Sequence, residues 1–118
     1  MSSLTVTKGD VVLVDVPYLD ATQSVRRPAL VVSDSSQMLD VIIAGITSRI
    51  RAPLPPTHYV VDRKHPDWSA SGLRLVSAIR GDRLFTVETA SIQRVLGRLS
   101  PATMLAVDQC LKRALRIA

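Results

Sequence analysis

The sequence is short of several residue types, and each shortage argues against a class of function. Cys110 is the only cysteine among 118 residues, so there is no internal disulfide, cysteine-built zinc site or dithiol redox pair. Glu88 is the only glutamate, which removes the glutamate pairs of glycoside hydrolases. Phe, Trp and Tyr make up 3% of the chain, too few for the base-stacking platforms of RRM or OB-fold domains.

Motifs for cofactors, metals and membranes are missing as well. The chain contains no GxGxxG, GxxxxGK[ST] or HExxH pattern, so we expect neither a cofactor nor a metal ion. Its first residues lack a charged start followed by an apolar core, and no apolar run approaches ~18 residues. We therefore expect a cytoplasmic protein with no membrane contact.

The residues that are present suit one folded domain with an anionic partner. The hydrophobic fraction is 47%, and a chain of this length is expected to form a single domain over residues 1–118. The 15 basic residues outnumber the 10 acidic ones, and 12 of the 15 are arginine. The balance of +5 favours a polyanion such as a nucleic acid, although a merely basic protein has the same composition.

Strand-forming segments dominate the local pattern. β-branched runs predict strands at residues 11–16, 29–33, 41–46, 58–62 and 75–87, with bulges at Gly45 and Gly81. Residues 91–97 fit either a strand or a helical turn, whereas prolines make residues 51–57 a loop. Ser100 and Pro101 are typical of the start of a helix, and apolar residues then recur at helical spacing. These features predict a mainly β, small antiparallel barrel closed by a C-terminal helix.

Two adjacent arginines precede the second predicted strand. Pro28 disfavours a helical conformation at Arg27, so we expect Arg26 and Arg27 to be extended at the end of a long loop, residues 17–27, where the strand begins. Such a pair can bind an anion, or it can be a solvated guard against edge-to-edge aggregation.

A second charged group lies in the segment Arg80-Gly81-Asp82-Arg83. In an extended chain Arg80 and Asp82 point to the same face, where they form either a base beside a stabiliser of negative charge or a structural ion pair. Thr47 and Ser48 offer hydroxyls that bind a phosphate oxygen or cap a turn. For the two histidines, His58 and His65, a surface or structural role is favoured over a catalytic one.

The combination of these segments resembles the PemK/MazF family of toxins from bacterial toxin-antitoxin systems. The matching blocks occur in family order: Gly-Asp-Val at 9–11, Gln-Ser-x-Arg-Arg-Pro-Ala-Leu-Val-Val-Ser at 23–33, Ile-Thr-Ser at 46–48, Arg-x-Asp-Arg-Leu-x-Thr at 80–86 and Gly-Arg-Leu-Ser at 97–100. The resemblance implies an SH3-like β-barrel with a C-terminal helix. It also implies a homodimer that cleaves single-stranded RNA without a metal and is silenced by a cognate antitoxin.

The resemblance also suggests residue roles. Arg27, Thr47, Arg80 and Asp82 match catalytic positions, and we assign Asp82 as the base that takes the proton of a ribose 2′-OH, giving a 2′,3′-cyclic phosphate. Since guanidinium hardly releases its proton, Arg27 and Arg80 are expected to stabilise the phosphorane with Thr47. The expected RNA-binding residues are Gln23, Ser24, Arg26, Ser48 and Arg83.

The first loop departs from the family pattern. Residues 21–25, Ala-Thr-Gln-Ser-Val, lack the acidic residue and the glycine that many members carry there. If that missing acid is the base, the protein is slow or inactive; if Asp82 is, it cleaves RNA. Two alternatives therefore stay open: a non-catalytic co-repressor that binds operator DNA only with its antitoxin, and a gyrase-poison-like toxin of the same fold.

Overall fold

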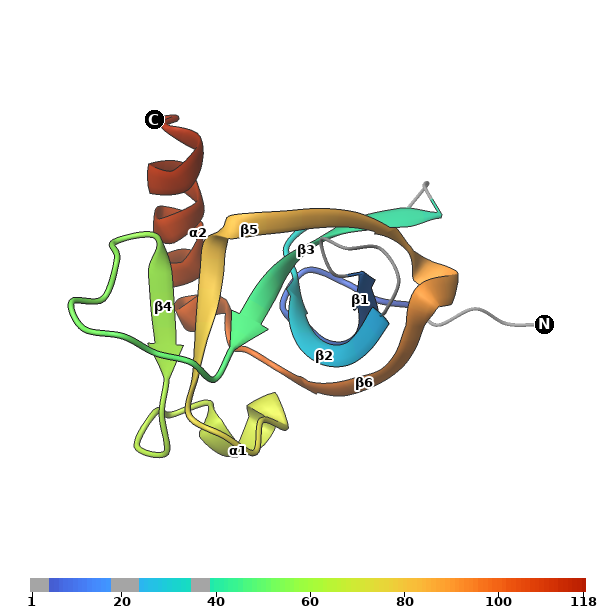
Figure 1. The fold of residues 1–118 in the computed structure, drawn as a ribbon, viewed down its shortest axis with the longest axis horizontal. Helices are drawn as coiled ribbons and strands as arrows, with labels where there is room; N and C mark the ends of the chain where they lie inside the picture. The colour runs from blue at the N-terminus through green and yellow to red at the C-terminus, as the bar shows by residue number, and fades with distance from the viewer. Residues whose placement is uncertain (1–4, 18–23, 35–38) are drawn as a thin grey trace.

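The chain folds into one curled antiparallel sheet and a C-terminal helix, seen in a computed structural model that describes residues 5–17, 24–34 and 39–118 (Figure 1). The strands are β1 (Asp10–Pro17), β2 (Ser24–Val31), β3 (Asp40–Thr47), β4 (His58–Val61), β5 (Ser77–Glu88) and β6 (Ile92–Arg98). The helical segments are α1 (Trp68–Ser71), the 3-10 turn η1 (Thr89–Ser91) and α2 (Pro101–Leu115).

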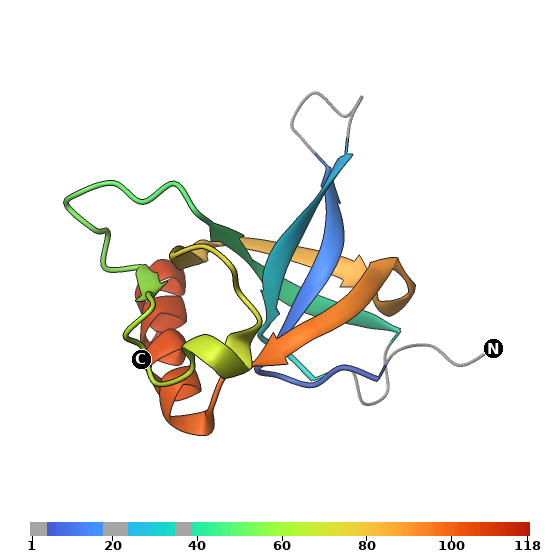
Figure 2. The same cartoon turned by 90° about the horizontal axis from the view of Figure 1, so that it is seen from below.

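The sheet order explains the barrel-like shape. The strands lie in the order β4-β5-β3-β2-β1-β6, and each adjacent pair is antiparallel, so β4 and β6 are the two edges. Figures 1 and 2 show the sheet curling so that β1 and β2 lie inside the bend made by β3, β5 and β6. The prediction of a mainly β, small SH3-like barrel with a C-terminal helix is confirmed, with the sheet curled rather than closed.

The expected boundary of the second strand was wrong. β2 begins at Ser24, so Arg26 and Arg27 lie inside the strand, opposite Asp15 and Val14 of β1. Pro28 does not prevent this pairing, because β3 pairs only with Ala29–Val31 and leaves this part of β2 with one described neighbour. The hairpin with β1 is therefore longer than the sequence pattern indicated.

The other ambiguous segments also have definite structures. Residues 77–88 form one long bent strand, and residues 92–98 form a strand paired with β1. The short helix α1 was missed, because four residues are too few to show helical periodicity. It ends at Gly72, which has φ 73°, a left-handed conformation that suits glycine.

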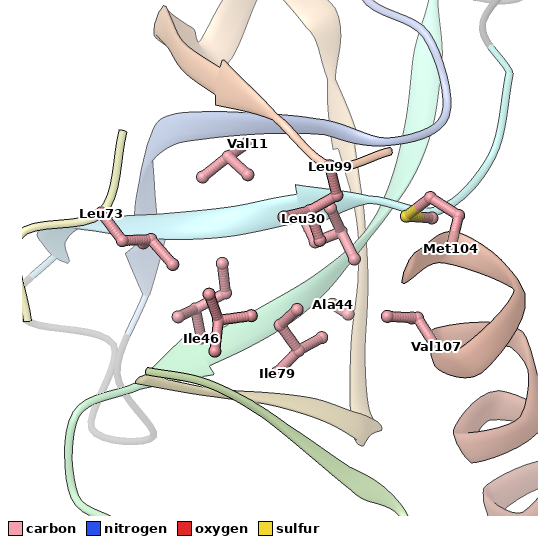
Figure 3. Packing of buried hydrophobic residues seen from close by; sticks show 10 residues of the cluster. Val11, Leu30, Ala44, Ile46, Leu73, Ile79, Leu99, Met104 and Val107 are labelled. Carbon is pink, nitrogen blue, oxygen red and sulfur yellow. The ribbon is translucent and has the colours of Figure 1, made fainter. Parts of the chain in front are cut away.

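Neighbouring residues of a strand point to opposite sides of the sheet, so consecutive apolar residues supply side chains to both faces. Two clusters of buried apolar side chains result. One cluster, shown in Figure 3, consists of Val11, Leu30, Ala44, Ile46, Val61, Leu73, Ile79, Leu99, Met104 and Val107. The other consists of Val6, Val12, Val14, Ala29, Val31, Val41, Ile43 and Ile92. Aliphatic side chains fill both clusters, as the low aromatic content predicts.

α2 packs against the first of these clusters through Met104 and Val107 (Figure 3). The Ser100 side chain accepts a hydrogen bond from the Thr103 amide, which confirms the predicted N-cap. The helix also reaches the strand edge beyond the cluster: the Cys110 thiol donates to the carbonyl of His58 at 3.6 Å. The start of β4 is thus held against the helix.

Candidate active site

A bend in β5 creates the site. Ala44 of β3 pairs with Leu84 and Ile46 pairs with Ile79, so residues 80–83 of β5 lie opposite Gly45 alone. The predicted irregularities at Gly45 and Gly81 are thus one feature, in which the extra residues of β5 are pushed out of the ladder. A Cβ placed on Gly45 would lie 3.6 Å from the aliphatic part of Arg83, an ordinary packing distance, so the Arg83 side chain lies over the strand at Gly45.

Gly81 holds the bend against the following structure. Its amide donates to the Thr57 carbonyl at 2.8 Å, and a Cβ on Gly81 would lie 2.8 Å from the same oxygen. Any larger residue would have to move the loop before β4. The flanking residues Arg80 and Asp82 are therefore fixed at the point where β5, β4 and that loop meet.

Arg80 and Asp82 form a two-pronged ion pair within this bend. Arg80 Nε donates to Asp82 Oδ1 and Nη2 donates to Oδ2, each at 3.0 Å. The hydrogen bond to Arg80 is the main cause that lowers the pKa of Asp82, and the same bond raises the pKa of Arg80. The prediction that both side chains share a face is confirmed, and Asp82 is held as an anion.

His58 joins this pair from the neighbouring strand. It lies directly opposite Arg80 in the β4–β5 ladder, and its Nε2 is 3.3 Å from Asp82 Oδ1. The imidazole is 15% exposed, and the Asp82 side chain is 38% exposed. The sequence favoured a surface or structural role for His58, so its place in this charged cluster was missed.

Next to this cluster lies a cavity of about 270 Å³ that gathers the predicted catalytic residues. Arg27, Thr47, Arg80 and Arg83 contribute to its wall, with Gly45 and Phe85 among the others. Thr47 Oγ1 accepts a hydrogen bond from the Arg49 amide, which leaves its own proton available to an acceptor in the cavity. With Arg49, four cations and a hydroxyl donor are thus arranged around one space, which suits a phosphate group.

Two further cavities adjoin this one and share part of its wall. One shares Thr47, Arg49 and Arg80 with it and adds Arg51, His58 and two prolines. The other shares Arg27, Pro28 and Ile46 and adds, among others, Arg26, Ser48, Arg74 and Arg94. We call the three cavities together the arginine track. Its length and charge suit an extended polyanion rather than a single small anion.

The predicted site residues are mostly brought together. Arg27, Thr47, Arg80 and Arg83 share the central cavity, Asp82 joins them through Arg80, and Arg26 and Ser48 line the adjoining one. Ser24 is the first residue of β2, opposite Pro17, and Gln23 lies outside the described residues.

Besides His58, sequence reasoning missed Arg49, Arg74 and Arg94, because no pattern links these scattered arginines before the strands are paired.

Over residues 5–17, 24–34 and 39–118, no three His, Cys, Asp or Glu side chains are grouped so that they could hold a metal ion. In the same ranges, no helix combines the length and the apolar character that crossing a membrane requires.

Comparison with known proteins gives a family and a set of similar folds. Residues 7–115 match the family described as PemK-like, MazF-like toxin of type II toxin-antitoxin system. No curated protein sequence matches the chain.

Solved structures of low sequence identity share the fold. An endoribonuclease from Mycobacterial species is 22% identical, with a TM-score of 0.73 over 99% of this chain and 97% of its own. A second, in complex with its cognate antitoxin, is 23% identical, with a TM-score of 0.74 over 96% and 97%. The MazE-MazF structure from Deinococcus radiodurans is 18% identical, with a TM-score of 0.75 over 98% and 100%.

Proposed function

Because the chain belongs to the family of PemK-like, MazF-like toxins of type II toxin-antitoxin systems, we propose that it is an endoribonuclease that cleaves single-stranded RNA. The observation that carries this proposal is the central cavity, where Arg27, Thr47 and Arg80 surround one space and Arg80 holds the carboxylate of Asp82. The similar structures include proteins named as endoribonucleases, which supports the assignment.

The scissile phosphate occupies the central cavity in this proposal. Arg27 and Arg80 stabilise the negative charge that grows on the phosphorane, and the Thr47 hydroxyl donates to one of its oxygens. The flanking phosphates follow the arginine track, where Arg26, Ser48 and Arg83 contact them together with Arg74 and Arg94. Gln23 and Ser24 remain predicted RNA contacts from the sequence.

The chemical step is attack of a ribose 2′-oxygen on the adjacent phosphorus. The 2′-OH loses its proton, the P–O5′ bond breaks, and the products are a 2′,3′-cyclic phosphate and a free 5′-OH. We place the proton acceptor in the cluster of Arg80, Asp82 and His58. From the sequence, Asp82 was assigned as the base. The step requires a 2′-OH, so DNA is not a substrate.

We further propose the partners that the family membership implies. The protein acts as a homodimer in the cytoplasm, is silenced by a cognate antitoxin, and contacts operator DNA only together with that antitoxin. The similar structure from Mycobacterial species that is named as a complex with its cognate antitoxin supports the antitoxin as a partner. No metal and no cofactor takes part in the proposed reaction.

Cleavage assays on matched substrates test the activity. The purified protein is incubated with EDTA and a long single-stranded RNA of mixed sequence, and the cut positions are mapped. A short oligonucleotide with the preferred site is then compared with the same oligonucleotide carrying 2′-deoxyribose at the scissile nucleotide. We expect cleavage of the RNA only, with a 2′,3′-cyclic phosphate on the 5′ fragment.

Other outcomes would contradict the proposal. Cleavage of the 2′-deoxy substrate would rule out 2′-oxygen attack, and loss of cleavage in EDTA would rule out the metal-independent step. Absence of cleavage on every RNA would instead favour the co-repressor or the gyrase-poison-like toxin. Operator binding with the antitoxin and inhibition of DNA supercoiling distinguish those two alternatives.

A further inference from the structure

The proton acceptor of the proposed reaction has to satisfy two conditions. It must present a free lone pair toward the 2′-OH, and it works best when it titrates near the operating pH. Asp82 keeps unused lone pairs but meets the second condition poorly. Both of its oxygens accept hydrogen bonds from Arg80, and this contact lowers the pKa of its carboxyl below the usual value of 3.8.

His58 places an imidazole in the same cluster. An imidazole changes charge near neutral pH, so it can take a proton and give it back under the same conditions. Its Nε2 is 3.3 Å from Asp82 Oδ1, and the tautomer that carries its proton on Nε2 has its lone pair on Nδ1. His58 contributes to the wall of a cavity of the arginine track that Thr47 and Arg80 also line.

The backbone around His58 is fixed on both sides. Its amide donates to the Pro55 carbonyl at 3.0 Å, and its own carbonyl accepts from the buried Cys110 thiol of α2. Its strand partner is Arg80 itself, so the imidazole and the ion pair are positioned by one ladder. A fixed backbone and an adjacent carboxylate are the two features that orient a histidine for proton transfer.

The charged groups around His58 come from three elements. Arg80 and Asp82 belong to β5, Arg49 and Arg51 belong to the segment after β3, and Arg113 of α2 donates to the Pro56 carbonyl at 3.2 Å. Burial raises the pKa of the Cys110 thiol, which therefore stays uncharged. Asp82 is the one anion among these groups, so it is the group that opposes the surrounding positive charge.

We propose that His58 is the catalytic base of the ribonuclease reaction and that Asp82 is its positioning carboxylate, an inference that rests on the proposed function. The 2′-OH gives its proton to Nδ1 as the P–O2′ bond forms and the P–O5′ bond breaks. The departing 5′-oxygen takes a proton from a water molecule. His58 then releases its proton to the resulting hydroxide, so protons balance and no water is consumed.

The decisive variant is His58→Gln. The glutamine amide retains an N–H that can face Asp82 and cannot accept a proton at neutral pH. We expect the single-turnover cleavage rate of bound RNA to fall about 10²- to 10⁴-fold, with unchanged affinity for the uncleavable 2′-deoxy oligonucleotide. In His58→Ala, added imidazole is expected to restore part of the rate.

The matched control is His65→Gln. His65 has both ring nitrogens in structural contacts, with the Tyr59 hydroxyl at 2.8 Å and the Asp67 amide at 2.9 Å. We expect this variant to be less stable but to retain the cleavage rate of the folded protein. Since it keeps His58 as its only histidine, it should also retain the fall in rate toward acid pH that protonation of the base causes.

A substrate with a different leaving group distinguishes a catalytic base from a catalytic acid at His58. A 5′-bridging phosphorothiolate substrate expels a thiolate, which needs no proton donor. If His58 is the base, the wild-type rate on this substrate still falls toward acid pH and His58→Gln remains slow. These measurements on wild type and His65→Gln decide the matter even if His58→Gln does not fold, which its thermal unfolding would reveal.

Three results would overturn the inference. The first is a wild-type rate that stays level from pH 8 to 5, as expected if Asp82 accepts the proton directly. The second is a His58→Gln variant with the wild-type rate and pH profile while wild type cleaves RNA; the proposed function then stands without this inference. The third is absence of cleavage by wild type, which removes the proposed function and this inference together.

Discussion

Each of the two histidines of this chain lies near an aspartate, and the two neighbourhoods differ in what satisfies their polar atoms. Around His65 and Asp67, the partners come mainly from the fold itself: Asp67 Oδ2 accepts from the Ser100 amide at 2.8 Å and its hydroxyl at 2.9 Å. Around His58 and Asp82, the partner is the guanidinium of Arg80, and a cavity adjoins the group.

Their exposure differs in the same sense. Asp67 is 8% exposed and ties the chain before α1 to the start of α2, whereas the Asp82 side chain is 38% exposed. A polar group whose contacts are completed by backbone stabilises the fold, and one completed by a cation beside a cavity can exchange partners with a ligand. We call His65 and Asp67 the closed pair, and His58 and Asp82 the open pair. Variants of each pair test this difference.

Asp82→Asn gives the largest expected effect. It removes the charge of the open pair while keeping its shape, so Arg80 loses its two-pronged partner and the imbalance of positive charge grows. We expect single-turnover cleavage to fall about 10²- to 10⁴-fold with little change in thermal unfolding. Asp67→Asn is the control: it should lower the temperature of thermal unfolding and leave the cleavage rate of the folded protein unchanged. Equal losses of activity in both variants would contradict the division into two pairs.

Arg27→Ala tests whether the central cavity belongs to the open pair's chemistry. Arg27 lines the same cavity as Arg80, from a different strand. Losing one stabiliser of the phosphorane is expected to lower the cleavage rate of bound RNA about 10²- to 10³-fold. Arg49→Ala, which removes an arginine that lines this cavity and an adjoining one, is expected to cost less. A rate that depends more on Arg49 than on Arg27 would place the scissile phosphate elsewhere.

The sequence predicted the elements better than it predicted their pairing. Ser100 and Pro101 identified the start of the C-terminal helix. Arg80 and Asp82 were expected on one face because residues two apart in a strand point to the same side. His58 could not be found in this way. Its nearness to Asp82 depends on the register between β4 and β5. A loop with three prolines within four positions precedes β4, so no local sequence pattern predicts that register.

The position of Arg26 and Arg27 shows a second limit. Pro28 and the polar segment before it favoured a loop, but pairing with β1 extends the hairpin back to Ser24. Tertiary pairing overrode the local preference, since proline is tolerated where one side of a strand is not paired. The two arginines are consequently adjacent residues of a strand, and both contribute to the wall of one cavity of the arginine track.

Asp67→Ala tests the closed pair. It leaves the Ser100 amide and hydroxyl without their acceptor where the chain enters α2, which should cost about 1–3 kcal/mol of unfolding free energy. Urea unfolding should show a lower midpoint with an unchanged slope. Cleavage per folded molecule should equal that of wild type. A stable protein with a slower cleavage rate would show that the closed pair also serves the reaction.

The acid dependence of stability follows from the same aspartate. Burial by itself raises the pKa of Asp67, but hydrogen bonds from Thr103 and Ser100 outweigh it, and the pKa lies below the usual 3.8. A carboxyl with a lowered folded-state pKa stabilises the protein above pH 3.8, and this contribution is lost as the pH falls through the lowered value. Unfolding free energies of wild type should therefore decrease more steeply below pH 4 than those of Asp67→Asn.

Arg26→Ala is expected to have the smallest effect, confined to binding. Arg26 lines the outer cavity of the arginine track, its side chain is 64% exposed, and its Nε lies 3.7 Å from Asp15. An exposed cation that contacts one RNA phosphate contributes about 0.7 to the slope of log affinity against log salt. We expect Arg26→Ala to weaken binding of the uncleavable oligonucleotide and to reduce that slope, with the cleavage rate of bound RNA unchanged. Because its strand neighbour Arg27 should affect mainly the rate, the two variants form a matched pair. If rate and affinity moved together in both, the division between an open catalytic centre and a purely electrostatic outer track would be wrong.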